Sequence, residues 1–189
     1  MVIQEEPIAL LSEHAEIPIA FIVDRILEVS TPDDGLGGIT FNEAPVDVPW
    51  EKDYDSIKGE GPTRWPKRFD TSNWGLIAAH DRSARVGGAV IAYSTAAVNM
   101  LEGSSDVAGL WDLRVHPDAR GSGLGSRLFS AVEAWARQRG CRTLTVETQN
   151  INVPACRFYA RMGCRLGSIN RFAYPQLPDE TQLVWVKGL

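Results

Sequence analysis

The sequence predicts an α/β protein with a mixed β-sheet, and two stretches of the chain carry that prediction. Residues 110–115 and 142–148 are rich in apolar and β-branched side chains, and a glycine loop and a helix lie between them. A strand–helix–strand connection of this kind is right-handed and makes its two strands parallel. Residues 75–80 and 87–93 form two more apolar runs with a short polar connection, which indicates an antiparallel hairpin.

The first 74 residues give weaker signals. Residues 5–16 are expected to form a short helix, because Pro7 stands early and apolar residues recur on one side. Residues 17–29 are expected to form a strand, followed by turn chemistry in 30–38. From 41 to 74 the chain is rich in acids, prolines and aromatic residues without periodicity. We expect there either a lid over the substrate or a surface excursion that its aromatic residues hold in place.

The second half has clearer periodicity. Apolar residues recur at helical spacing from Leu124 to Trp135, and Gly140 supplies a stop signal. Pro154 is well placed in the first turn of a short helix over 155–162, which Gly163 ends. The alternating residues of 164–174 and 181–187 are expected to form the closing strands of the sheet.

Composition limits the classes of function. The 189 residues carry a net charge of −5, which disfavours general nucleic-acid binding, and no apolar run approaches the roughly 20 residues of a membrane span. Residues 1–60 hold 14 acids against 3 bases, whereas residues 61–189 hold 10 acids against 16 bases. An acidic half suits a cationic amine substrate and a basic half suits an anionic cofactor. We expect one domain over 1–189, in the cytoplasm.

Cysteines and histidines give no sign of a metal site. The three cysteines are odd in number and lack CxxC spacing, so reduced thiols are the simple interpretation. His14, His80 and His116 are scattered without paired ligand residues, and we expect each to be exposed and without a catalytic role.

The loop Arg120-Gly121-Ser122-Gly123-Leu124-Gly125-Ser126 is a candidate cradle for a pyrophosphate. Its glycines allow tight turns, and the helix that follows presents unpaired N–H groups at the positive end of its dipole. A plain strand-to-helix turn is the simpler alternative. A dinucleotide-binding fingerprint, with Glu147 as the ribose acid, is a second alternative, although Ser126 stands where its third glycine belongs.

Two motifs resemble those of the GNAT superfamily of N-acetyltransferases. The pattern Arg120-x-x-Gly123-x-Gly125 resembles its acyl-CoA signature. The pattern Asn152-x-x-Ala155-x-x-Phe158-Tyr159-x-x-x-Gly163-Cys164 resembles its second motif, with Cys164 in place of the usual Phe. Residues 146–159 look like the streptothricin acetyltransferase branch. The resemblance is firm over 109–189 and loose over 1–108.

The resemblance implies a fold and a binding mode. A mostly antiparallel sheet would splay at its central parallel strand pair, with helices on both faces and acyl-CoA in the splay. Residues 1–108 would form mainly the acceptor side and residues 109–189 the acyl-CoA half. The expected cofactor contacts are backbone bonds from Leu113, Arg114 and Val115 to pantetheine, the loop residues Arg120, Gly121, Ser122, Gly123, Leu124, Gly125 and Ser126 around the pyrophosphate, and Asn152 and Tyr159 beside the thioester.

Acetyl transfer to an amine needs a base for the ammonium, an N–H for the oxyanion and a proton donor for the thiolate. In the family a tyrosine often gives that proton, and this role maps onto Tyr159, whose alternative is a packing role. Asp112 and Glu147 are candidate bases, because alternation puts Asp112 on the face opposite Trp111. Either could be structural, a base could come from the lid, or positioning alone could suffice.

The expected function is therefore acetyl-CoA-dependent N-acetylation of a primary amine on a small molecule, for example a streptothricin-like antibiotic, which would confer antibiotic resistance. No metal is expected. The alternatives are a catalytically silent acyl-CoA sensor, a dinucleotide-binding oxidoreductase and a protein-modifying acetyltransferase. A homodimer is one option for the oligomeric state.

Overall fold

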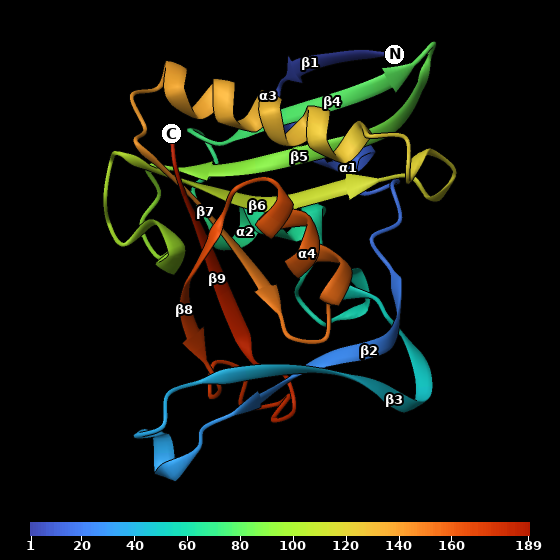
Figure 1. Ribbon diagram of the computed structural model, residues 1–189. Coiled ribbons are helices and arrows are strands. Elements are labelled where there is room, and N and C mark those ends of the chain that lie inside the picture. The colour runs from blue at the N-terminus through green and yellow to red at the C-terminus, as the bar shows by residue number, and fades with distance from the viewer. The chain divides into compact units, whose positions relative to one another are not determined.

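The computed structural model describes all residues, 1–189, and the chain forms two compact units (Figure 1). The first unit contains residues 1–20, 53–146 and 186–189, and the second contains residues 21–52 and 147–185. None of the helices is long and apolar enough to cross a membrane.

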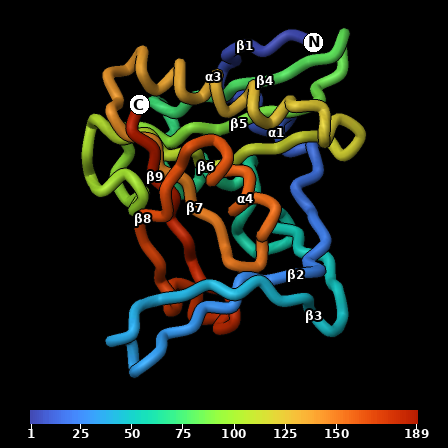
Figure 2. Tube along the Cα trace, in the orientation of Figure 1, coloured from blue at the N-terminus to red at the C-terminus, as the bar shows by residue number.

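The first unit is built on a mixed sheet. Its strands β1 (Val2–Glu6), β4 (Gly75–Asp81), β5 (Ala84–Tyr93) and β6 (Val107–Val115) pair in that order, all antiparallel. The first part of β7 (Thr143–Gln149) then pairs with β6 in parallel, as the crossover rule predicts. In Figure 2 the traces of β4, β5 and β6 run side by side.

Helices cover both faces of this sheet, as expected. On one face lies α3 (Leu124–Gln138), whose Leu124 and Leu128 pack so closely on β5 that a Cβ on Gly87 would lie 3.1 Å from each. The opposite face carries α1 (Leu11–His14) and α2 (Trp65–Arg68). A core fills the space beneath these short helices, made of Leu11, Trp65, Trp74, Leu76, Val90, Ala92, Val98 and Leu101.

The helix expected over residues 5–16 is wrong for most of its length. Residues 2–6 form β1, which pairs with β4 from Val2 opposite His80 to Glu6 opposite Leu76. Only a 3₁₀ turn over Ile8–Leu10 and the four-residue α1 are helical. Pairing with an existing sheet edge outweighs local helix propensity, which is a weak preference over so few residues.

The second unit contains a long two-stranded hairpin, β2 (Phe21–Ser30) and β3 (Thr40–Lys52), joined by the expected turn. It also contains the end of β7, the helix α4 (Val153–Arg161) and the strands β9 (Gln182–Gly188) and β8 (Arg165–Asn170), with hydrogen bonding in the order β7-β9-β8. The final residues of β9 return to the first unit.

The stretch 41–74, expected to be irregular and to form either a lid or a surface excursion, has two parts. Its beginning is strand β3, which contains a large irregularity. Trp50 pairs with Val23 and Pro45 pairs with Arg25, so the four residues 46–49 lie opposite Asp24 alone. A two-stranded ribbon tolerates prolines because its outer edges need no donor. The remainder, 53–74, is a run of turns in which Trp65 and Trp74 are only 4% and 5% exposed. Those aromatic rings anchor the segment in the core.

Candidate active site

Strand β6 loses its parallel neighbour halfway along its length. Pairing with β7 covers Val107–Leu110 opposite Thr143–Val146 and goes no further. Leu113, Arg114 and Val115 pair with β5 alone, opposite Ala89, Gly88 and Gly87. One edge of this segment therefore has no strand partner, and an extended ligand could add backbone hydrogen bonds there.

A β-bulge at Trp111 changes the side-chain alternation of β6. Leu110 pairs with Ile91 and Asp112 pairs with Val90, so Trp111 is the extra residue. Its ring lies 6.2 Å from that of Trp65 and 5.2 Å from that of Trp74, on the same face as the core cluster. The expectation that Trp111 and Asp112 point to opposite faces is wrong, because strict alternation fails at a bulge.

Asp112 is enclosed by a buried polar network. One carboxylate oxygen lies 2.7 Å from Nε2 of His14, and Arg114 donates to both oxygens at 2.9–3.1 Å. Burial alone would raise the pKa of Asp112, but the hydrogen bond to His14 and the charge of Arg114 outweigh it and hold the pKa at about 2. Such a carboxylate is a weak proton acceptor, which favours the structural alternative for Asp112.

His14 is the clearest departure from the sequence prediction among the histidines. It was expected to be exposed, yet its side chain is fully buried and lies 98 positions from its partner Asp112. A Cβ on Gly88 would lie 2.6 Å from its Nδ1, so the ring needs a glycine opposite it. His80 and His116 are both half-buried: His80 bonds Glu6, and His116, whose side chain is 40% exposed, accepts from the N–H of Asp118.

The glycine loop adopts the backbone geometry that its sequence predicts. Gly121 and Gly123 have φ values of 75° and 81°, in the left-handed region that favours glycine. A Cβ at either position would meet no atom within 4 Å, so conformation rather than space requires glycine. Gly123 is the N-cap of α3 and has no side chain to cap it. The N–H groups of the first helical turn are therefore available to an anion.

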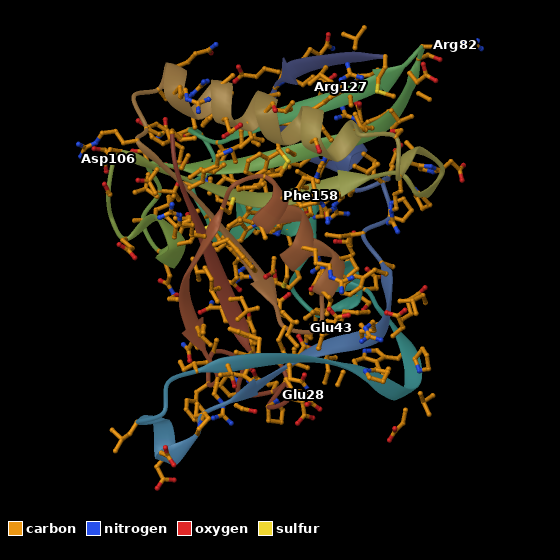
Figure 3. All side chains as sticks on the ribbon, viewed as in Figure 1. Glu28, Glu43, Arg82, Asp106, Arg127 and Phe158 are labelled. Atoms are coloured by element: carbon orange, nitrogen blue, oxygen red, sulfur yellow. The ribbon has the colours of Figure 1, made fainter.

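Arg120 braces this loop. Its Nε donates to the carbonyl of Val115 at 3.1 Å, and its Nη2 donates to the carbonyl of Ala20 at 3.3 Å. Ser122 supports the same turn by donating to the carbonyl of Ala119 at 2.6 Å. Arg127, labelled on α3 in Figure 3, is exposed and contributes a further positive charge close to the loop in sequence. The loop thus combines open backbone donors with two cationic side chains.

In the second unit, Glu147 belongs to a network of neutral side chains. The hydroxyl of Tyr174 donates to one carboxylate oxygen at 2.6 Å, and the amide of Gln182 donates to the other at 2.7 Å. Gln149 donates to the Tyr174 hydroxyl at 2.8 Å. Sequence reasoning missed Tyr174 and Gln182, because no local pattern links them to a residue 27 or 35 positions away.

The second motif has a structural basis at the start of α4. The side-chain oxygen of Asn152 accepts from the N–H of Ala155 at 3.1 Å, and Val153 and Pro154 open the helix. Tyr159 is 7% exposed and packs edge-to-face against Phe158 at 5.2 Å. The motif therefore fixes the helix and the direction of the Tyr159 ring together.

The hairpin β2–β3 is acidic. Residues 21–52 hold seven acids against Arg25 and Lys52. Glu28 and Glu43 point to opposite sides of the hairpin (Figure 3). Glu43 bonds Arg25 and Arg157, which lowers its pKa, the hydrogen bond from Arg25 being the largest cause. Most of the other acids are exposed and suit the long-range attraction of a cation.

The predicted site residues divide between the two units. Asp112, Leu113, Arg114, Val115 and the loop 120–126 belong to the first unit, and Glu147, Asn152 and Tyr159 belong to the second. No group of three or more His, Cys, Asp or Glu side chains is arranged to hold a metal ion.

Several known proteins are similar to this chain in sequence and in fold. A streptothricin acetyltransferase of Escherichia coli is 37% identical over 84 residues, 43% of this chain, but the match spans only 48% of that relative. A streptothricin acetyltransferase of Streptomyces lavendulae is 27% identical over 85% of this chain and 79% of its own length. A Bacillus anthracis protein solved in complex with acetyl coenzyme A superposes with a TM-score of 0.75, at 24% identity, over 100% of this chain and 99% of its own.

The sequence pattern of the acetyltransferase (GNAT) family matches residues 46–164, which is more than half of the chain. That stretch includes β6, the glycine loop, α3, β7 and α4. Together with the parallel strand pair and the helices on both faces of the sheet, it places the chain in a family of known architecture. This protein belongs to the acetyltransferase (GNAT) family.

Proposed function

We propose that this protein is an acetyl-CoA-dependent N-acetyltransferase that acetylates a primary amine of a small molecule. The observation that carries the proposal is the open glycine loop at the N-terminus of α3, directly after the unpaired edge of β6. The similar protein of Bacillus anthracis was solved with acetyl coenzyme A, which supports that donor. The family match covers residues of both units, which supports a single acetyltransferase domain over 1–189.

The donor would bind mainly through the backbone. Leu113, Arg114 and Val115 would extend hydrogen bonds along the pantetheine, and the N–H groups of 121–126 would hold the pyrophosphate. The side chain of Arg114 is buried and donates to the carbonyl of Ile17, so only the backbone of this residue could contact the donor. Arg120 would act by holding the loop in shape.

The reaction would begin with attack of the neutral amine on the thioester carbonyl carbon. The tetrahedral oxyanion needs an N–H donor, and collapse of the intermediate breaks the C–S bond. Tyr159 would give the leaving thiolate its proton, while Asn152 would hold α4 in place beside the thioester. Of the two candidate acids, Glu147 is favoured to receive the proton of the amine, because the carboxylate of Asp112 is already hydrogen-bonded to His14 and Arg114.

The acceptor would be cationic. The acidic hairpin supports this substrate class, and the two relatives named as streptothricin acetyltransferases support a streptothricin-like antibiotic. Resistance to that antibiotic would be the physiological result. The three cysteines are free, which supports work in a reducing cytoplasm. The proposal includes a homodimer, for which the exposed Ile22, Val48 and Trp50 of the hairpin supply apolar surface.

The test is an acetyl-transfer assay. Purified protein is given acetyl-CoA and a panel of amines that includes streptothricin, and free thiol is measured together with the mass of the product. We expect a product 42 Da heavier from a cationic amine, about the mass that one acetyl group adds when an N–H becomes an amide. Tight acetyl-CoA binding without transfer to any amine would support the silent sensor instead. Light scattering on the same sample tests the homodimer.

A further inference from the structure

Three carboxylates of the second unit are half-buried, and one of them differs from the others. Glu43 bonds Arg25 and Arg157, and Glu180 forms an ion pair with Lys52 in which both side chains are 12% exposed. Glu147 takes part in no ion pair. Glu147 is therefore the one carboxylate among the three that forms no ion pair.

Neutral donors hold this carboxylate in a fixed position. Tyr174 donates to Oε1 at 2.6 Å and Gln182 donates to Oε2 at 2.7 Å, so each oxygen has one donor. Gln149 in turn donates to the Tyr174 hydroxyl, which directs the hydroxyl proton toward Glu147. Hydrogen bonds to an ionised acceptor stabilise the charge without cancelling it. Each carboxylate oxygen also has lone pairs left for a further donor.

The segment that presents Tyr174 is itself anchored. Thr181, at its end, exchanges hydrogen bonds with Asn150: the Asn150 N–H donates to the Thr181 carbonyl, and the Thr181 N–H donates to the Asn150 side chain. Glu180 binds Lys52 of β3. The buried Asn150 also donates to the carbonyl of Leu27 in β2. Tyr174 is therefore held by a framework that fixes segment 171–181 on both strands of the hairpin.

We propose that Tyr174 is a positioning residue for Glu147, and that the carboxylate it orients receives a protonated amine of the acceptor. The inference rests on the proposed function and deepens it, because it names the residue pair that selects a cationic acceptor. The charge of Glu147 attracts the ammonium, and the Tyr174 hydroxyl fixes the direction in which the carboxylate meets it.

The test is a double-mutant cycle with Tyr174→Phe, Glu147→Gln and the double variant. Binding of streptothricin is measured by calorimetry, and acetyl transfer to it is measured by thiol release. We expect Tyr174→Phe to weaken binding and lower kcat/KM about tenfold, the factor that corresponds to one lost hydrogen bond to an ionised group. In the Glu147→Gln background the same substitution should change either quantity less than about twofold, because Tyr174 then has no charge to orient.

The matched control is Tyr93→Phe, since the Tyr93 hydroxyl lies in the first unit and bonds only the carbonyl of Arg139. It should leave both quantities unchanged, and KM for acetyl-CoA should stay constant in all four proteins of the cycle. An equal Tyr174→Phe effect in both Glu147 backgrounds, or no effect in either, would overturn the inference.

Failure of the proposed function gives a different result. If the wild-type protein binds streptothricin with the expected cycle but transfers no acetyl group, the positioning role stands and the enzyme assignment fails. If it binds no streptothricin yet acetylates another amine without any dependence on Tyr174, the enzyme assignment stands and the inference fails.

Discussion

Arg114 donates to both carboxylate oxygens of Asp55, with Nη1 2.6 Å from Oδ2 and Nη2 2.8 Å from Oδ1. The same guanidinium donates to Asp112 and to the carbonyl of Ile17, so all of its nitrogens are engaged while its side chain is 1% exposed. Burial would lower the pKa of Arg114, but the two carboxylates raise it above its usual value. This buried arginine therefore joins segment 53–64 to strand β6, whose backbone is the proposed binding edge for acetyl-CoA.

Removing that arginine should be strongly destabilising. In Arg114→Met the buried Asp112 loses its compensating charge, and breaking one side of a buried pair costs about 3–5 kcal/mol. Urea denaturation measures the loss. Arg142→Met is the matched control, because Arg142 pairs with Asp106 while 83% of its side chain is exposed, and its loss should change the midpoint little. A similar midpoint shift in the two variants would contradict a buried network.

The same network predicts how stability depends on pH. Asp112 has a pKa of about 2 in the folded protein, below the roughly 3.9 of an unfolded chain. A depressed pKa gives stability that is fully present above the unfolded value and is lost as pH falls toward the folded value. Wild type should therefore lose stability between about pH 4 and pH 2 more steeply than Asp112→Asn. Thermal melts across that range measure this difference, and parallel curves would show that Asp112 does not titrate there.

Gly88 should not tolerate a side chain. A Cβ there would lie 2.6 Å from Nδ1 of His14 and 3.0 Å from the carbonyl of Ile77, and neither neighbour can move freely. We expect Gly88→Ala to destabilise the protein by about 1–3 kcal/mol, the usual cost of overpacking a core. Gly188→Ala is the control, because a Cβ at Gly188 would meet no atom within 4 Å. Chemical denaturation of both variants would refute the steric argument if their stabilities matched.

Gly123 should matter for the donor more than for stability. Because Gly123 has a φ of 81°, Gly123→Ala should lower the free energy of unfolding by about 1–2 kcal/mol. Gly140, at the other end of α3, has a φ of 78°, so Gly140→Ala should lower it by the same amount. Only Gly123 lies in the proposed pyrophosphate loop, so only its substitution should raise KM for acetyl-CoA, by tenfold or more. Steady-state kinetics on both variants, with melting curves alongside, tests this. Equal KM values in the two variants would remove the loop from the donor site.

Local signals explain which elements the sequence could predict. The spacing of Leu124, Leu128 and Val132 predicted α3, and the cap Asn152 with Pro154 predicted α4, because a helix satisfies its own backbone. The hairpin β4–β5 was likewise predicted from adjacent runs. Strand β1 was not, since an edge strand of Gln4, Glu5 and Glu6 has no apolar pattern and depends on the partner strand β4, some 70 residues on.

The candidate site could likewise be predicted only where it depends on residues close together in the sequence. The glycine loop is contiguous, so its geometry followed from the order of its residues. The environments of Asp112 and Glu147 depend on His14, Asp55, Tyr174 and Gln182, which lie far away in sequence. Strand alternation gave the wrong face for Trp111, because a single inserted residue reverses every position on one side of it. Long-range pairs and bulges leave no local pattern.

Tyr159 should affect chemistry and leave binding intact. If it protonates the leaving thiolate, Tyr159→Phe keeps the buried ring and removes only the proton donor, so kcat should fall about 10²-fold or more. The acetyl-CoA dissociation constant and the melting temperature should stay close to those of the wild type. Thiol-release kinetics and calorimetry measure the two effects separately. If Tyr159→Phe stays slow even with acceptors whose amine is already neutral, the defect lies at departure of the thiolate and not at deprotonation of the amine. A kcat equal to that of the wild type would instead leave Tyr159 as a packing residue, because an enzyme that needs no acid at this position releases coenzyme A as the thiolate.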